Sequence, residues 1–323
     1  MFESDLSTAS SNIDYRIKVS LVILTYNRPT LLKKQLICVA SINYRPFDVV
    51  VVDNNSDQPV TDIVNEYQFV RLIQMEANLG VAGRNRGIEA AEGDIVITLD
   101  DDVHGISDSD INTLITLFQN SSIGAVCFKV MDAETNAIIN WCHHRKQEEF
   151  SEKTFLTEEI TEGAVAFRKS VLGQAGLYPE EFFISHEGPD LALRIMNCGY
   201  RVIYTPDIVV HHSHSSIGRP GWRRYYYDTR NLIWLVLRNY PFLPGLKRLV
   251  VGLGAMAIYA LRDGYFWYWL KGVLNGIKGG RWALAGRSPM TSHTRTLLNE
   301  IAEFRPGFWY MVEQRLLKRG VEI

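Results

Sequence analysis

The stretch "DIVITLDDDV", residues 94 to 103, places an apolar run directly before three consecutive aspartates. The apolar run predicts a strand buried inside a sheet. The carboxylates of Asp100, Asp101 and Asp102 repel one another, and a divalent cation would hold them together. Mg²⁺ or Mn²⁺ suits such oxygen ligands and would bind through one or two carboxylates plus the phosphates of a ligand. The alternative interpretation is a solvated acidic turn.

Strand and helix patterns alternate around this stretch. Apolar runs at 18–27, 47–57 and 69–76 predict strands, and the segments 30–42 and 80–93 have helical spacing. This order predicts an α/β fold with a mostly parallel central sheet flanked by helices. Ligands of such sheets bind beyond the carboxyl ends of the strands. Polar clusters follow three of these strands, and we expect them to converge on one crevice.

Composition limits the function classes. The chain has 323 residues, of which 46% are hydrophobic and 22% charged, enough for one large domain with an appendage. The net charge of −2 gives no sign of nucleic-acid binding. The four cysteines have no metal-type spacing and predict free thiols in a reducing compartment. The N-terminus is polar without an apolar signal core, so a cytoplasmic location is expected.

The C-terminal part of the chain differs in charge from the rest. From Trp222 onward there are 16 Lys and Arg against 6 Asp and Glu, a balance of +10. The composition therefore predicts a flexible N-terminus (1–17), a main domain (18–221) and a C-terminal helical extension (222–323).

The extension has no uncharged apolar run that is long enough to span a bilayer. The longest, 249–261, has 13 residues, whereas a span needs about 20. The aromatic run 265–270 has basic neighbours and predicts an interfacial helix at a membrane surface. The alternative is that the helices of the extension pack together or form a homodimer.

Several blocks of the chain resemble, in order, those of family 2 glycosyltransferases with the GT-A fold. The blocks are "VSLVILTYNRP" (19–29), "VVVVDNNSD" (49–57), "NLGVAGRNRGI" (78–88), "IVITLDDDV" (95–103) and the pattern from 163 to 212. The resemblance implies the transfer of a sugar from a nucleoside-diphosphate sugar to an acceptor, with inversion. It also implies that Asp102, with Asp100, holds the cation that bridges the donor diphosphate, while Asp101 or Asp100 contacts the ribose.

The resemblance extends to further donor contacts. Asp53 falls where the family contacts a uracil or thymine base, and a carboxylate suits the N3–H of either, so UDP- and dTDP-sugars both fit. A histidine at the end of a later strand often adds a metal ligand in this family. Of His211, His212 and His214, His212 fits that position best, and the alternative is a surface cluster. The other residues expected against the donor are Thr25, Asn27, Arg28, Asn54, Asn78, Arg84, Gly163 and Ala164.

The catalytic base is less well defined. An inverting transfer needs a carboxylate to take the proton of the acceptor hydroxyl. The family has two adjacent acids before x-Asp-Leu, and the second is the usual base; here "HEGPDLALR" puts Glu187 on the first acid and Gly188 on the second. We expect Glu187 to serve, with Asp190 as the alternative. Pro189 fits a first helical turn, where Asp190 would also suit the helix dipole.

Acceptors open to such an enzyme are a glycan, a lipid-linked glycan or a small molecule. Lipid-linked acceptors are frequent in the family, which makes the inner face of the membrane a plausible location. The glycine at position 188 leaves open a non-catalytic nucleotide-sugar-binding protein. A nucleotidyltransferase fits less well, because "LTYNRPT" (24–30) lacks the Gly-rich basic loop that such an enzyme would place after its first strand.

Overall fold

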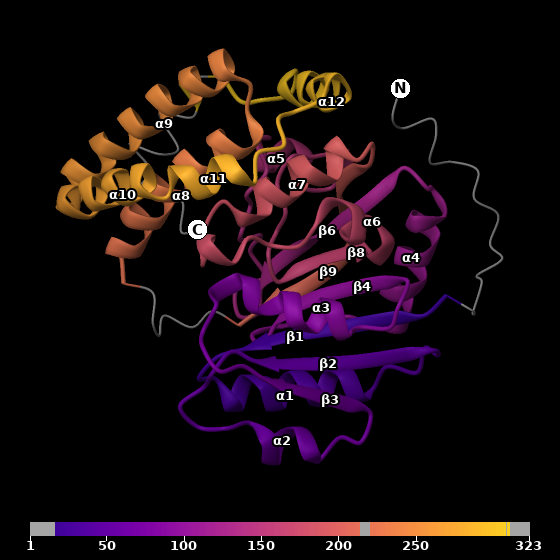
Figure 1. Ribbon diagram of the computed structural model, residues 1–323. Coiled ribbons are helices and arrows are strands. Elements are labelled where there is room, and N and C mark those ends of the chain that lie inside the picture. Colours follow the sequence, from indigo (N-terminus) through magenta and orange to yellow (C-terminus); the bar gives the residue numbers. More distant parts are fainter. Residues whose placement is uncertain (1–16, 214–219, 308, 311–323) are drawn as a thin grey trace.

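The computed structural model describes residues 17–213, 220–307 and 309–310 and has an α/β architecture (Figure 1). Residues 1–16 of the expected flexible N-terminus and His214 lie outside the described residues. Within the described part, nine strands form one sheet in the order β3-β2-β1-β4-β8-β6-β9-β5, with β7 paired to β9. The strands are β1 (Val19–Thr25), β2 (Phe47–Asp53), β3 (Val70–Gln74), β4 (Ile95–Asp100), β5 (Val103–His104), β6 (Ile123–Asp132), β7 (Phe155–Leu156), β8 (Ala164–Arg168) and β9 (Arg201–His212).

The sheet is parallel in its first half and mixed in its second. Strand β1 runs parallel to β2 and β4, and β2 runs parallel to β3. Strand β8 runs antiparallel to both of its neighbours, β4 and β6. The expected α/β fold with strands 1 to 4 in parallel is confirmed, and β8 makes the complete sheet mixed.

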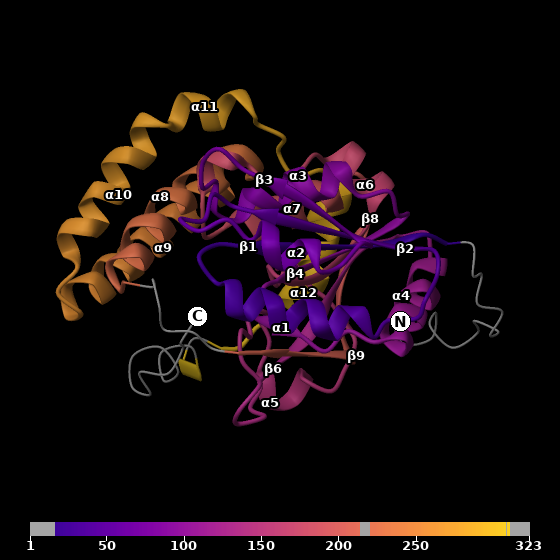
Figure 2. The same cartoon turned by 90° about the horizontal axis from the view of Figure 1, so that it is seen from below.

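Helices cover both faces of the sheet (Figures 1 and 2). Leu21 and Ile23 of β1 belong to the hydrophobic core on one face, and Val22 belongs to the core on the other. Burial on both faces explains the unbroken apolar runs of these strands. The helices of this part are α1 (Pro29–Ala40), α2 (Thr61–Asn65), η1 (Gly80–Gly83), α3 (Arg84–Ala90), α4 (Asp108–Gln119), α5 (Gln147–Phe150), α6 (Lys169–Ala175), η2 (Glu180–Phe182) and α7 (Glu187–Asn197).

Strand register brings the polar strand ends together. Thr25 lies beside Asp53 in the β1–β2 pair, and Leu24 lies beside Asp100 in the β1–β4 pair. Helix α3 packs closely on β1 in the same region. Gly87 permits this contact, because a Cβ at position 87 would lie only 2.3 Å from Val22 Cγ1. The expected convergence on one edge of the sheet is confirmed.

The C-terminal extension forms a group of helices on one side of the molecule (Figures 1 and 2). Its helices are α8 (Trp222–Asn239), α9 (Phe242–Arg262), α10 (Phe266–Lys278), α11 (Gly280–Ala285) and α12 (Ser292–Ala302). Helix α8 packs against α7, and α9, α10 and α11 pack against α8. The expected boundary near residue 221 separates β9 from α8, but α8 is an integral neighbour of the main domain.

Helix α9 is longer than the uncharged run of 13 residues that it contains. The helix continues through Lys247 and Arg248 and has 21 residues, which corresponds to about 31 Å. By length and composition it is the one helix of the described residues that could cross a membrane, with a mean hydropathy of 1.3 and 6% of that window buried. The argument that the apolar segment is too short to span is therefore wrong.

Candidate active site

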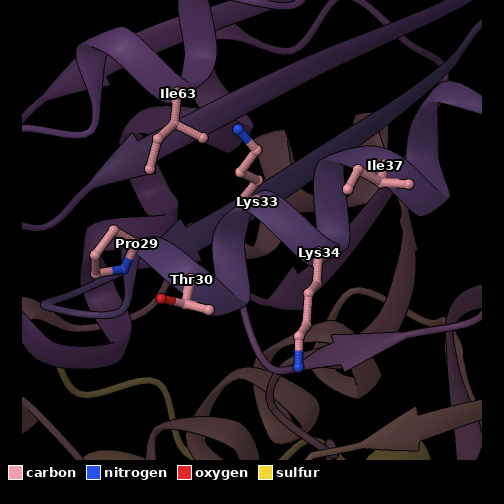
Figure 3. A pocket seen from close by; sticks show the side chains of 6 residues that line it. All are labelled: Pro29, Thr30, Lys33, Lys34, Ile37 and Ile63. Carbon is pink, nitrogen blue, oxygen red and sulfur yellow. The ribbon is translucent and has the colours of Figure 1, made fainter.

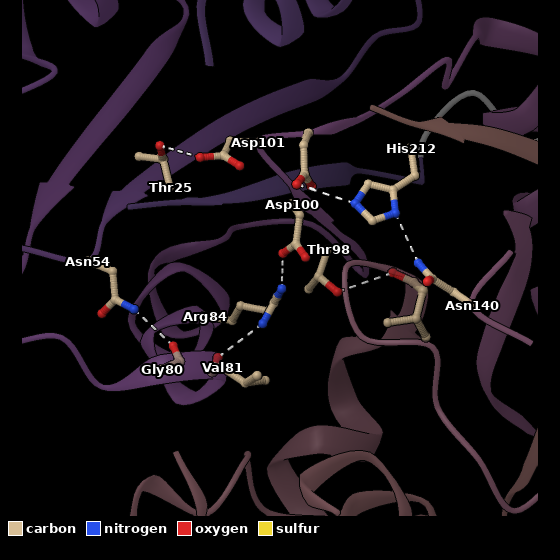
Figure 4. A network of polar contacts seen from close by, with 12 residues as sticks. Thr25, Asn54, Gly80, Val81, Arg84, Thr98, Asp100, Asp101, Asn140 and His212 are labelled. Atoms are coloured by element: carbon tan, nitrogen blue, oxygen red, sulfur yellow. Dashed lines mark hydrogen bonds and ion pairs between the residues drawn. The ribbon is translucent and has the colours of Figure 1, made fainter. Parts of the chain in front are cut away.

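Asp101 and Asp102 are held at the end of β4 by groups from the end of β1; Figure 4 shows the contact of Thr25 with Asp101. The hydroxyl of Thr25 donates to Asp101 Oδ2 at 2.7 Å. Arg28 Nη1 lies 3.3 Å from Asp101 Oδ1 and also donates to Asp102. Burial raises the pKa of Asp101 to about 7, although Thr25 and Arg28 favour its ionised form. The row of aspartates is thus an organised cluster and not a solvated turn.

Asp100 points away from its neighbours toward Arg84 of α3. The guanidinium of Arg84 is 2% exposed, donates to Asp100 and also reaches the carbonyl of Val81 at 3.3 Å. Arg84 was expected against the donor, but in the structure its guanidinium is bonded to Asp100 instead. A guanidinium this deeply buried needs a carboxylate partner, and Asp100 supplies it.

Asp102 meets His212 across the site. The Nε2 atom of His212 lies 3.3 Å from Asp102 Oδ2, and its Nδ1 lies 3.1 Å from Asn140 Nδ2 (Figure 4). Among the described residues no three His, Cys, Asp or Glu side chains form a preformed metal group. The Asp102–His212 pair nevertheless offers an oxygen and a nitrogen ligand. That donor set fits a divalent cation that takes its remaining ligands from a diphosphate and water. His211 instead lies beside His104, with ring centroids 6.2 Å apart.

The loop before η1 is fixed by two asparagines. Asn54 donates to the Gly80 carbonyl at 2.9 Å and to Asn78 Oδ1 at 3.0 Å. Asn78 accepts from the backbone N–H of Gly80 at 2.8 Å. Asn27, which has a positive φ of 55°, joins the β1 loop to Asp57 through a hydrogen bond of 2.9 Å. These asparagines fix the loops at this edge of the sheet.

Three further expected residues lie at the same edge in different environments. Asp53 is 3% exposed and accepts from the backbone N–H of Ser56 at 3.0 Å. Gly163 has a φ of +75°, and an added Cβ would lie 2.6 Å from the carboxylate of Asp100. The close approach that Gly163 allows is therefore to Asp100. Ala164 is buried inside β8 opposite Leu99, so the expected contact of Ala164 with the donor is not supported.

Helix α7 separates the two base candidates. Asp190 is fully buried and accepts from Arg194 Nε and Arg238 Nε, each at 2.8 Å, and from Asn239 Nδ2 at 2.7 Å. Glu187, at the first position of the helix, is 3% exposed, and its Oε2 has no hydrogen-bond partner among the described residues. Burial, followed by the charge of Glu162, raises the pKa of Glu187 well above its usual value. Asp190 is a packing centre, whereas Glu187 is a carboxyl without a cation of its own.

Two groups at this site were not expected from the sequence. Glu162 lies over Gly188, and Asn231 of α8 donates to three carbonyls of the loop before α7, at Phe182 (3.0 Å), Ile184 (2.7 Å) and Ser185 (2.7 Å). That loop contains three non-glycine residues with positive φ, namely Phe183, Ser185 and His186. Strained backbone of this kind persists where its surroundings hold it. The sequence signal for Glu162 was its position directly before Gly163, a residue that was expected against the donor.

A shallow depression on the outside of α1 and α2 lies apart from this cluster (Figure 3). Its lining includes the aliphatic side chains of Ile37 and Ile63 and the stems of Lys33 and Lys34. It contains no residue of the expected site, and its apolar lining does not suit a diphosphate.

The fold agrees with comparisons to known proteins. Residues 20–174 match the family model described as "Glycosyl transferase family 2". The O-antigen chain rhamnosyltransferase RfbN of Salmonella typhimurium is 24% identical over 229 residues, which are 65% of this chain and 71% of that protein. The GalNAc(5)-diNAcBac-PP-undecaprenol beta-1,3-glucosyltransferase of Campylobacter jejuni is 26% identical over 178 residues, 51% of this chain and 56% of that protein.

Solved structures show the same fold. The mannosyltransferase of Pyrobaculum calidifontis, in complex with GDP-Man and Mn²⁺, superposes with a TM-score of 0.58 at 18% identity, covering 97% of this chain and 88% of that one. Staphylococcus aureus TarS 1–349, in complex with UDP-GlcNAc, gives a TM-score of 0.59 at 15% identity and covers 90% and 93%.

The family-model match and the glycosyltransferase relatives identify an enzyme of the glycosyl-transfer class. Residues 20–174 match a family 2 glycosyltransferase domain, and the described part of the chain has a GT-A-like fold similar to that of the solved neighbours.

Proposed function

We propose that the protein transfers a sugar from a UDP- or dTDP-sugar to an acceptor hydroxyl, with inversion and with help from Mg²⁺ or Mn²⁺. The observation that carries the proposal is the 3.3 Å approach of Asp102 and His212, which come from the ends of two strands far apart in the sequence. These two residues would hold the cation. When bound, the cation neutralises charge that builds up on the departing diphosphate.

The same edge of the sheet offers a place for the nucleotide. The buried carboxylate of Asp53 suits the N3–H of uracil or thymine, and Thr25, Asn27 and Arg28 lie on the neighbouring loop. Asn54 and Asn78 fix the loop before η1 at the same edge. Once a cation is bound to the Asp102 carboxylate, Arg28 would leave Asp101 and Asp102 and bind phosphate oxygens of the donor instead.

Of the two acids on α7, Glu187 is the one we propose for the base chemistry. Arg194, Arg238 and Asn239 hold the carboxylate of Asp190. They place its pKa below the usual value even though burial opposes this. A carboxylate with a lowered pKa is a poor proton acceptor, whereas burial and the charge of Glu162 raise the pKa of Glu187 and make its carboxylate a stronger proton acceptor.

Thermal shift and calorimetry with a panel of nucleotide sugars, with and without Mn²⁺, test the proposal. A donor that binds the folded state raises the melting temperature by mass action. Mn²⁺-dependent binding of a UDP- or dTDP-sugar, followed by release of UDP or dTDP, is the expected result. Binding without any release would favour a non-catalytic nucleotide-sugar-binding protein, and release of pyrophosphate from UTP or dTTP would favour a nucleotidyltransferase.

We also propose a lipid-linked glycan as the acceptor class and the inner face of the cytoplasmic membrane as the location. The name of the Campylobacter relative includes an undecaprenol-linked glycan, and RfbN is named for the O-antigen chain. Helix α9 exposes an apolar stripe with helical spacing. The stripe consists of Leu243, Leu246, Val250, Ile258 and Leu261, which are 49–74% exposed.

An anionic lipid surface suits this stripe better than a second copy of the chain. Lys247 and Arg262 lie on α9, and Lys271 and Lys278 lie on the neighbouring helix α10. Two copies of such a basic surface would repel each other. Trp267 of α10, 61% exposed, adds an aromatic group of the kind found at membrane interfaces. Helix α9 packs on α8 along its other face, which favours a helix lying in the interface.

A further inference from the structure

Glu162 occupies an unusual position above the start of α7. A Cβ added to Gly188 would lie 1.9 Å from Glu162 Oε1 and 2.9 Å from its Cδ. The backbone N–H of Gly188 also bonds to this carboxyl group. The carboxyl of Glu162 thus fills the space that any side chain at position 188 would need, and only glycine permits the arrangement.

Glu162 and Glu187 together form a pair of interacting acids. Burial raises the pKa of Glu162 to about 7, and burial together with the charge of Glu162 raises the pKa of Glu187 well above its usual value. Because the two carboxyls interact, ionisation of one disfavours ionisation of the other. Glu187 is buried, whereas Glu162 is half-buried.

The pair lies beside the proposed donor site. The carbonyl of Gly163, the residue after Glu162, accepts from the backbone N–H of Asp100 at 3.4 Å. An added Cβ on Gly163 would touch the Asp100 carboxylate. Arg84, the buried partner of Asp100, also feels the charges of Glu162 and Glu187. The two acids therefore lie next to the strand end where the sugar–diphosphate bond would break.

Two neighbouring acids on the same segment lie within 4 Å of basic side chains, unlike Glu162. Glu158 pairs with Arg305 and with His144 at 3.1 Å, and Glu159 lies 3.4 Å from the same histidine. Among the described residues Glu162 makes no ion pair within 4 Å. An acid that is partly buried without a partner destabilises the fold at neutral pH, and such groups are frequent at functional sites.

We propose that Glu162 and Glu187 act as a two-carboxylate base for the transfer proposed above, on which this inference rests. The acceptor hydroxyl gives its proton to the ionised member of the pair while its oxygen bonds to the anomeric carbon of the sugar. The bond from that carbon to the diphosphate breaks, and its electron pair leaves with the nucleoside diphosphate. Glu162 contacts the hydroxyl from the open side, and Glu187 lies behind it.

The test uses the full chain, Mn²⁺ and the nucleotide sugar that the unmodified protein binds most tightly in a panel of UDP-glucose, UDP-galactose, UDP-GlcNAc and dTDP-rhamnose. Hydrolysis of that donor, read as UDP or dTDP release, needs no known acceptor because water must also lose a proton. Glu162→Gln and Glu187→Gln should each lower release by at least about a hundredfold. The double variant should lose little more than either single variant, because the two acids work as a unit.

Two controls separate proton transfer from structure. Azide attacks as an anion and has no proton to lose, so sodium azide should restore UDP or dTDP release to both single variants. Glu159→Gln removes a buried acid of similar pKa from the same segment and should keep normal release. Donor affinity should change less than about twofold in all of these variants, since the amide keeps the shape of the acid.

Near-normal release by Glu162→Gln would overturn the inference. A Glu162→Gln variant that loses release but does not respond to azide, or loses donor binding in proportion, would also overturn it, because the residue would then act only on structure or binding. If the unmodified protein binds no nucleotide sugar with Mn²⁺, the proposed function fails before the variants are compared.

Discussion

Replacing Asp190 by asparagine should damage stability far more than chemistry. Asp190 is fully buried, and three donors from two helices, Arg194, Arg238 and Asn239, converge on its two oxygens. The amide keeps the size of the side chain but removes its charge and turns one acceptor into a donor. Both guanidiniums then stay largely buried, with side-chain exposures of 10% and 11%.

The size of the effect follows from that burial. Breaking a buried ion pair by removing one partner costs about 3–5 kcal/mol. Unfolding entropy of about 2.1 cal/mol/K per residue gives the whole chain roughly 0.7 kcal/mol/K, so the melting temperature should fall by about 4–7 °C. Asp62→Asn, on the exposed side of α2, is the matched control and should change stability by less than about 0.5 kcal/mol.

The stabilisation that Asp190 provides should depend on pH. Burial alone would raise the pKa of Asp190, but Arg194 and Arg238 outweigh it and hold the pKa below its usual value. A carboxyl with a lowered pKa in the folded state contributes stability above the unfolded pKa of about 4 and loses it as the pH falls. The difference in melting temperature between the parent and Asp190→Asn should therefore be full at pH 7 and shrink below about pH 4.

Glu187→Gln should show the opposite pattern. Because the pKa of Glu187 is raised on folding, its ionisation opposes folding at alkaline pH, and the amide should be at least as stable as the parent at pH 8. Differential scanning calorimetry and donor turnover per folded molecule measure both properties. A stable but inactive Asp190→Asn, together with a Glu187→Gln of near-normal turnover, would refute this reasoning and make Asp190 the base.

Other predictions concern the metal, the membrane and the loop before α7. Asp102→Asn should keep the fold and lose most Mn²⁺-dependent affinity for UDP or dTDP in calorimetry, because one anionic ligand is removed; unchanged affinity would exclude Asp102 from the cation site. The double variant Leu246→Glu/Val250→Glu should abolish flotation of the full chain with anionic liposomes at low salt. The control variant Ile37→Glu, on α1, should float normally. A parent chain that stays in solution and is a dimer by light scattering would favour the homodimer. Asn231→Ala should lower stability by about 1–3 kcal/mol and speed hydrogen exchange at the loop before α7, and unchanged exchange would show that the loop is held by other contacts.

Local sequence patterns determined the first half of the fold. The apolar run expected over 18–27 forms β1 from Val19 to Thr25, and the run over 94–102 forms β4 from Ile95 to Asp100. A strand buried on both faces needs apolar side chains at every position, and this signal can be read without knowing the neighbours. The convergence of Thr25, Asp53 and the aspartates followed from parallel pairing alone.

Tertiary packing decided what each charged group does. The sequence indicates that Arg84 and Asp190 carry charge, but not that Arg84 faces Asp100 or that Arg238 of α8 faces Asp190. Nor does it show that Glu162 folds over Gly188. Arg84 and Asp100 lie 16 residues apart in the chain, and Asp190 and Arg238 lie 48 apart. The geometry of these contacts is set by how the helices pack. Local propensity contains no information about such distances, so the sequence determined the strands and the site edge, and only the folded structure assigned partners to the charges.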